Sequence, residues 1–128
     1  PFGYDPGIMP QMKASFFEAD RTLVETAMAV CREVNPDIEV YEGRVLSGDQ
    51  FISDNDKKNW LISTFDGSCT EMEGAAIAHA AYLNNIAYVV IRAISDKADG
   101  SAQMDYPEFE RAAAKHSAKL VETLVTRV

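Results

Sequence analysis

Two glutamates flank a methionine in the stretch CTEMEGAAIAHA, residues 69–80. The small apolar residues that follow are typical of a buried helix, and a carboxylate beside such a helix is costly unless it is paired or takes part in chemistry. Thr70 and Glu73 have the T-x-x-E spacing of a capping box, in which each side chain satisfies a backbone N–H at the helix start. On spacing alone, capping is the favoured interpretation of Glu73, and binding or chemistry is the alternative.

A second acidic candidate, Asp96, directly follows the apolar run AYVVIRAIS, residues 87–95. We predict a strand there, with Arg92 inside it. Ligands of open α/β sheets bind outside the carboxyl ends of the strands, so an acid at this place has a reason to be functional. The alternative is an ordinary turn or N-cap aspartate whose salt-bridge partner is Arg92.

A third candidate stretch, SGDQFISD at residues 47–54, also follows a predicted strand. Phe51 offers an aromatic face there, and Ile52 offers neighbouring backbone groups. Core packing is the more frequent fate of such residues. Of the two histidines, we expect His79 to be a partly buried helix residue and His116 a surface residue.

Alternating helices and strands must position these groups, so the predicted fold class is α/β. Residues 1–12, rich in Gly and Pro, predict an irregular loop. The periodicity predicts helices over 15–34, 54–65 and 105–128, the last with Pro107 in its first turn, and strands over 38–47 and 87–95. So few strands among long helices make a poor closed core, and the chain does not begin with Met. We therefore expect a portion of a larger α/β domain.

Composition excludes several classes of protein. The 128 residues, 47% hydrophobic and 25% charged, are typical of one globular domain. Twelve basic against 20 acidic side chains give a net charge of −8, which argues against a nucleic-acid partner. No stretch approaches the ~20 apolar residues of a membrane span. We expect no metal, because no grouping has ligand spacing, and we expect Cys31 and Cys69 to be buried free thiols of a reducing cytoplasm.

The stretches SGDQFI, TEMEGAAIAH and VVIRAISDKAD, in this order, resemble the bacterial 5'-methylthioadenosine/S-adenosylhomocysteine nucleosidases, in the superfamily of the nucleoside phosphorylases. The resemblance extends from FGYDPGIMP to DYPEFERAAAKHSAKLVETLV and covers about the carboxyl-terminal half of the family's length. E-M-E is shared with purine and uridine phosphorylases, whereas AISD followed by AD favours the nucleosidases. The resemblance implies a three-layer nucleoside-phosphorylase-like fold, a central mixed sheet flanked by helices. Residues 1–128 would be the carboxyl-terminal part of this single domain.

The resemblance implies a reaction as well. Family members hydrolyse the N-glycosidic bond of 5'-methylthioadenosine and S-adenosylhomocysteine, and of 5'-deoxyadenosine, in methionine salvage and the activated methyl cycle. Adenine and a 5'-thio-substituted ribose are released through an oxocarbenium-like transition state. Glu73 matches the acid that holds the ribose hydroxyls, where a negative charge favours the cationic sugar. Asp96 matches the general acid that protonates adenine N7, for which burial would have to raise its pKa.

Further residues match the family's binding site. Phe51 matches the aromatic residue that stacks on adenine, and Ile52 the residue whose backbone reads the base edge. Met72 matches the residue that packs against the ribose, where a thioether suits a weakly polar face. Glu71, next to Met72, is expected to be a second polar contact.

Other matches lie around the acid and at the chain's start. Ser95 and Arg92 match supports of the general acid, and Tyr106 matches an aromatic residue of a lid, where the family often has Phe. Phe2 and Pro10 match residues that cross a dimer interface to cover the neighbour's 5'-alkylthio pocket. The resemblance thus implies a cytoplasmic homodimer that binds small adenine thionucleosides, without a cofactor.

Part of the family's machinery has no counterpart in these residues. The glutamate that activates the attacking water, near the family's amino terminus, is absent, as is a GSAGG-like segment. We therefore expect the isolated 128 residues to be inactive. Two alternatives stay open: a purine nucleoside phosphorylase, which uses phosphate as nucleophile, and a non-catalytic nucleoside-binding module. Lys97 is the one basic residue of 97–106, which favours hydrolysis.

Overall fold

The computed structural model describes residues 3–10, 12, 14–95 and 106–128. Helices and short strands alternate within these residues, as the α/β prediction requires. In chain order they are α1 (Arg21–Val34), β1 (Val45–Ser47), α2 (Asn55–Phe65), β2 (Cys69–Glu71), α3 (Gly74–Leu83) and α4 (Tyr106–Leu124). The predicted helices at 54–65 and 105–128 are confirmed as α2 and α4, whereas α1 begins at Arg21 and not at residue 15.

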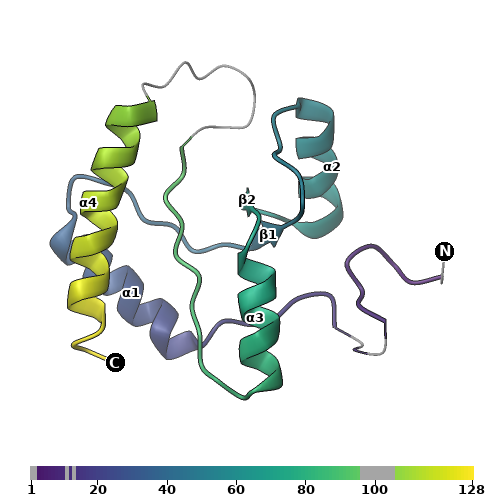
Figure 1. Ribbon diagram of the computed structural model, residues 1–128, viewed down its shortest axis with the longest axis horizontal. Coiled ribbons are helices and arrows are strands. Elements are labelled where there is room, and N and C mark those ends of the chain that lie inside the picture. Colours follow the sequence, from purple (N-terminus) through teal and green to yellow (C-terminus); the bar gives the residue numbers. More distant parts are fainter. Residues whose placement is uncertain (1–2, 11, 13, 96–105) are drawn as a thin grey trace.

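The two strands form a parallel pair at the centre of the molecule (Figure 1), and α2 is the crossover between them. Their register places Val45 opposite Cys69 and Ser47 opposite Glu71. Strands that run parallel end at the same edge of their sheet. Ser47 and Glu71 are therefore side by side at the carboxyl edge, directly before α3.

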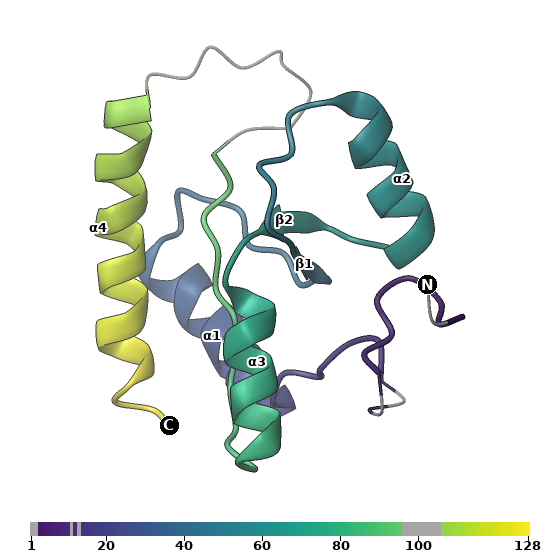
Figure 2. The same cartoon turned by 45° about the vertical axis from the view of Figure 1, so that its right-hand side comes forward.

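Two of the strand predictions need correction. Of residues 38–47, only Val45–Ser47 is a strand, although the predicted end at Ser47 is confirmed. The predicted strand at 87–95 is wrong, because the structure describes this whole segment and assigns no strand to it. It runs as an irregular extended chain between α3 and α4 in both orientations (Figures 1 and 2). Its Tyr88 carbonyl accepts from the backbone N–H of Asp20 at 2.9 Å, a bond to the start of a helix and not to a strand.

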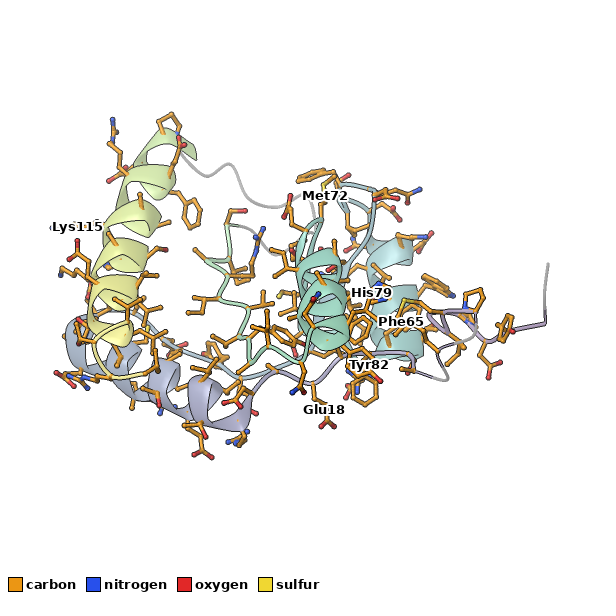
Figure 3. All side chains as sticks on the ribbon, turned by 60° about the horizontal axis from the view of Figure 1, so that its bottom comes forward. Glu18, Phe65, Met72, His79, Tyr82 and Lys115 are labelled. Carbon is orange, nitrogen blue, oxygen red and sulfur yellow. The ribbon has the colours of Figure 1, made fainter. Side chains whose placement is uncertain are left out.

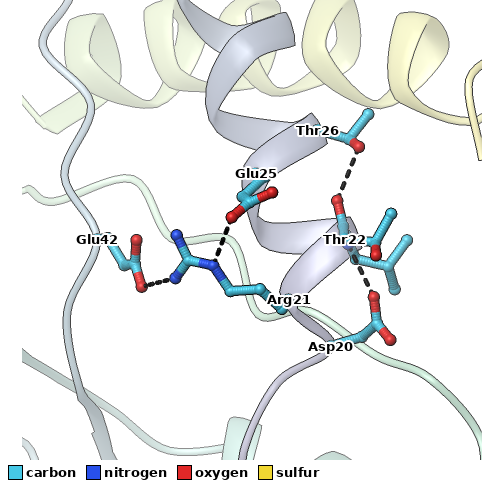
Figure 4. A network of polar contacts seen from close by, with 7 residues as sticks. Asp20, Arg21, Thr22, Glu25, Thr26 and Glu42 are labelled. Carbon is cyan, nitrogen blue, oxygen red and sulfur yellow. Dashed lines mark hydrogen bonds and ion pairs between the residues drawn. The ribbon is translucent and has the colours of Figure 1, made fainter.

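Asp20 sets the start of α1. It adopts an extended conformation, and its carboxylate accepts from the backbone N–H of Leu23 at 2.9 Å, the bond expected of an N-cap. The first turn carries a charged network (Figure 4) in which the Arg21 guanidinium lies 2.7 Å from Glu25 and 2.5 Å from Glu42. The network links α1 to the chain that leads into β1.

The main core lies between α1 and α4. Val30, Cys31 and Leu120 are buried together there, and the partly buried Val34 and Val40 pack against them. Burying one such side chain stabilises a fold by about 1.5–3 kcal/mol. Both cysteines are free thiols, as predicted, with Cys31 buried and Cys69 half-buried.

Polar contacts attach the end of α1 to α4. Asn35 is 1% exposed, and its side-chain N–H donates to the His116 carbonyl at 3.0 Å. The His116 ring lies 3.1 Å from the Asp37 carboxylate and its side chain is 21% exposed. His116 is therefore half-buried and not fully exposed, as a surface histidine would be, and its ring contacts the exposed Asp37 carboxylate.

Large apolar side chains nevertheless reach the surface. Ile77, Tyr82 and Leu83 on α3 are 60%, 60% and 66% exposed. Within the described ranges, no helix combines the length and the apolarity needed to cross a bilayer.

Candidate functional site

The candidate site is built at the carboxyl edge of the two strands. Glu71 ends β2 with its side chain only 2% exposed, although it is a carboxylate. The Ser47 hydroxyl, directly opposite in the register, donates to Glu71 Oε1. A buried charge is tolerable only when it is paired and hydrogen-bonded, and parallel pairing supplies the first of these partners.

The start of α3 supplies the next partners. Glu71 Oε2 accepts from the backbone N–H of Glu73 at 2.9 Å and of Gly74 at 2.7 Å. The N–H of Ala75 donates to Ser47 Oγ, also at 2.7 Å. Three successive N–H groups, which a helix leaves without internal partners, are thus satisfied by two side chains from the strand ends.

The predicted capping box is therefore wrong. Glu73 is the N-cap residue, but its side chain makes no capping hydrogen bond within the described part of the chain. Glu71 takes that function because it rises from the buried end of β2 directly beneath the helix. The Glu73 carboxylate is left 63% exposed at the mouth of this edge.

Arg92 approaches both glutamates from the 87–95 segment. Its Nη1 atom lies 3.5 Å from Glu73 Oε2 and 3.8 Å from Glu71 Oε2, and its side chain is 41% exposed. The sequence paired Arg92 with Asp96, which lies outside the described residues. One guanidinium between two carboxylates reduces the repulsion of having both ionised in one place.

The electrostatics of the edge favour an ionised Glu71. Burial raises the pKa of its carboxyl, but the hydrogen bonds from Ser47, Glu73 and Gly74 and the charge of Arg92 lower it more, so the net pKa lies below the ordinary value. The neighbouring Cys69 thiol has a raised pKa, because burial and the Glu71 charge both disfavour the thiolate. Cys69 is therefore unsuited to act as a nucleophile at neutral pH.

Three other predicted contacts lie around this edge. Met72 stands between the two glutamates and is 51% exposed, and Figure 3 shows it at the amino-terminal end of α3. Ile52 is half-buried and lines a pocket of about 300 Å³ that Ser47 and Glu71 also line. Phe51, which precedes Ile52 in the chain, is 78% exposed and is not among the residues that line this pocket. An exposed aromatic ring and a small pocket are suited to hold a flat base.

The remaining predicted residues are not brought to the edge by the described contacts. Phe2 and Asp96 lie outside the described residues. Tyr106 begins α4, but its side chain is not described. Pro10 is exposed on the amino-terminal segment, and Ser95 is half-buried at the end of the 87–95 run.

A larger hollow adjoins the edge but has a different character. It measures about 1580 Å³ and lies between α1, α3, α4 and the segments at 38–47 and 88–94. Binding sites for small molecules are about 300–1,000 Å³ with a few convergent polar groups. The hollow is larger and mostly apolar, although Ser47, Gly74 and Arg92 of the strand edge also line it. His79 lines it and stacks on the Phe17 ring at 5.2 Å, which agrees with a partly buried helix histidine (Figure 3).

Ser47 is the participant that sequence reasoning missed. Its role depends on lying opposite Glu71, and the register of a parallel pair cannot be read from two separate stretches of sequence. The available signal was weak: a serine at the predicted end of one strand, and an acid before a helix elsewhere.

Comparison with known proteins places this geometry in a family. Residues 1–126 match the family described as the phosphorylase superfamily. The chain is 38% identical over 131 aligned positions to the 5'-methylthioadenosine/S-adenosylhomocysteine nucleosidase of Exiguobacterium sp. (strain ATCC BAA-1283 / AT1b), an alignment that covers 99% of this chain and 54% of that protein. The chain thus spans about half the length of this relative.

Solved structures agree with this placement. The 5'-methylthioadenosine/S-adenosylhomocysteine nucleosidase of Helicobacter pylori, complexed with an aminopyrrolopyrimidine-substituted pyrrolidinol, matches with a TM-score of 0.85 and 35% identity, over 99% of this chain and 53% of that one. The futalosine hydrolase of Helicobacter pylori strain 26695 matches with the same TM-score, identity and coverage. The chain belongs to the phosphorylase superfamily and has its nucleoside-phosphorylase-like α/β fold.

Proposed function

We propose that this chain is the carboxyl-terminal part of an N-glycosidic hydrolase that releases adenine from 5'-methylthioadenosine and S-adenosylhomocysteine. The observation that carries the proposal is the exposed Glu73 side chain, held at the strand edge beside Arg92 and two residues beyond Glu71, which lines the Ile52 pocket. The named nucleosidases that the chain resembles support it.

The chemistry of the edge suits that reaction. Positive charge develops on the ribose as the bond to the base breaks, and a carboxylate that accepts from the ribose hydroxyls stabilises that charge. Glu73 is exposed and not used for capping, so it is available to the sugar, with Met72 beside it. Phe51 and Ile52 would hold the base, and Asp96, supported by Ser95, would donate the proton that makes adenine a neutral leaving group.

The proposal extends to the wider setting of the enzyme. It would act in methionine salvage and the activated methyl cycle in the cytoplasm, and 5'-deoxyadenosine would be a further substrate. Phe2 and Pro10 would reach the neighbouring site in a homodimer, and Tyr106 would belong to a lid. Because relatives are about twice as long, the isolated 128 residues are expected to release no adenine.

A second candidate substrate is futalosine, because a futalosine hydrolase matches as well as a nucleosidase does. The deciding experiment incubates the polypeptide that carries both halves of the fold with methylthioadenosine, adenosylhomocysteine or futalosine, each with and without phosphate. Adenine and free methylthioribose without phosphate support the proposal. Turnover of futalosine alone would favour the second candidate, and a sugar 1-phosphate formed only with phosphate would favour a phosphorylase.

Glu73→Gln tests the residue at the centre of the proposal. The amide keeps the shape but loses the charge, so kcat is expected to fall about 100-fold, equivalent to about 2.7 kcal/mol of transition-state stabilisation. Glu122→Gln on the exposed face of α4 is the matched control and should leave kcat unchanged. Equal kcat for the two variants would show that Glu73 does not contact the sugar.

A further inference from the structure

The pair formed by the half-buried Ser47 and the buried Glu71 has a geometry that capping alone does not explain. The two side chains together bind three consecutive backbone N–H groups, those of Glu73, Gly74 and Ala75. Most N-caps bind one or two such groups. Here the peptide groups immediately before and after the Glu73 Cα are both anchored to the strand edge.

These hydrogen bonds fix the backbone of Glu73, whose side chain is exposed. Glu73 donates its own N–H to Glu71 Oε2, while its carboxylate stays 63% exposed. A side chain on a fixed Cα has only its rotamers left to choose, and Arg92, 3.5 Å from Glu73 Oε2, favours one position of the carboxylate. A group that must meet a transition state gains from being held within a fraction of an ångström of the productive position.

Glu71 itself is poorly placed to touch a ligand. Its side chain is 2% exposed. One carboxylate oxygen accepts from Ser47, and the other accepts from two N–H groups and faces Arg92. A carboxylate accepts about four hydrogen bonds in all, so little of its capacity remains for a substrate hydroxyl. This differs from the second polar contact that the sequence suggested.

We propose that Ser47 and Glu71 are a positioning pair, which sets the Glu73 carboxylate against the ribose hydroxyls without contacting the substrate. This inference rests on the proposed function. It assigns a role to Ser47, and it moves Glu71 from substrate binding to the support of its neighbour.

The test is a thermodynamic cycle between the pair and the sugar hydroxyls. The polypeptide that carries both halves of the fold is assayed with methylthioadenosine and with its 2'-deoxy and 3'-deoxy analogues. The loss of kcat/KM on removing a hydroxyl is then compared between wild type and the variants Ser47→Ala and Glu71→Gln. The intrinsic reactivity of each analogue cancels in that comparison, so the remainder reports the coupling.

A positioning role predicts that the hydroxyl penalty is about tenfold smaller in both variants, because a misplaced Glu73 gains less from the hydroxyl. On methylthioadenosine, kcat should fall more than KM rises. Ser47→Thr keeps the hydroxyl and should restore the wild-type penalty. Ser63→Ala, on exposed α2, and Glu122→Gln, on α4, should change neither quantity.

Each result of these assays either supports or refutes the positioning role of Ser47 and Glu71. Variants that lose activity but keep the full hydroxyl penalty would show that the pair serves stability alone, and the positioning role would be refuted. Wild-type kinetics in Ser47→Ala would refute it as well. If the wild type releases no adenine from methylthioadenosine, the proposed function itself fails and this inference falls with it. If Glu71→Gln does not fold, the cycle is complete with Ser47→Ala and Ser47→Thr.

Discussion

Gly74 is the position where one added methyl group tests the packing of the site. A Cβ on Gly74 would lie 3.0 Å from Glu71 Oε1 and 3.2 Å from Cδ and Oε2. At these distances the carboxylate must move, yet Ser47, two N–H groups and Arg92 hold it in place. The Gly74→Ala variant should therefore stretch or break one of the charged hydrogen bonds.

The magnitude follows from two opposing effects. A hydrogen bond to a charged group contributes about 1.5–3 kcal/mol, whereas alanine in place of glycine in a helix gains up to about 1 kcal/mol. We expect a net loss of about 1–2 kcal/mol in the free energy of unfolding. Urea denaturation of the purified protein, followed by circular dichroism, measures it.

A second glycine at the same edge provides the matched control. A Cβ on Gly48 would meet nothing within 4 Å, and Gly48 has no positive φ. Gly48→Ala should leave the protein as stable as the wild type, or stabilise it by about 0.4–1 kcal/mol through the unfolded chain. If Gly74→Ala proves as stable as Gly48→Ala, the carboxylate is not held as described, and the reasoning about the edge is wrong.

Three further predictions concern stability, each measured by urea unfolding. Leu120→Ala opens a cavity against Val30 in the core between α1 and α4 and should cost about 2–5 kcal/mol, whereas the conservative Leu120→Met should cost less than about 1.5 kcal/mol. Asp20→Ala removes the cap on the Leu23 N–H and should cost about 1 kcal/mol, whereas Asp20→Asn keeps an acceptor and should cost less; equal losses would argue against the cap. Folding lowers the pKa of Glu71 below its ordinary value of 4.5, so the ionised carboxylate stabilises the protein at pH values above 4.5, and this contribution is lost as the pH falls below 4.5. The difference in the free energy of unfolding between wild type and Glu71→Gln should therefore shrink as the pH falls through that range. A difference that stays constant with pH would contradict the assignment.

The parts of the fold that local sequence controls were predictable. Asp54 caps α2 through the Lys57 N–H, and Pro107 lies in the first turn of α4, so both helices could be recognised from their own residues. The structure of residues 87–95 was not predictable, because their apolar side chains suit a strand but a strand also needs a neighbouring strand to pair with. The local sequence pattern sets the preference for a strand, but hydrogen bonding to a neighbouring strand determines whether one forms.

The candidate site, too, was only partly predictable from the sequence. Glu73 was recognisable as a carboxylate that stands out beside an apolar helix. The residue that caps α3 was not recognisable from the sequence. The T-x-x-E spacing favours Thr70 and Glu73, whereas burial at the end of β2 gives that function to Glu71. The sequence offered only a weak signal for Ser47, because its role depends on the register that places it opposite Glu71.

The bond between Ser47 and Glu71 also bears on how the strands find their alignment. Each strand has only three residues, too few for side-chain alternation to specify a register strongly. A slip by one residue would place the aliphatic Leu46 opposite Glu71, leaving a buried carboxylate without its hydroxyl and Ala75 without its acceptor. Such a loss costs about 1–3 kcal/mol for each unsatisfied group. The polar pair thus favours the native alignment over one that places an apolar residue opposite Glu71.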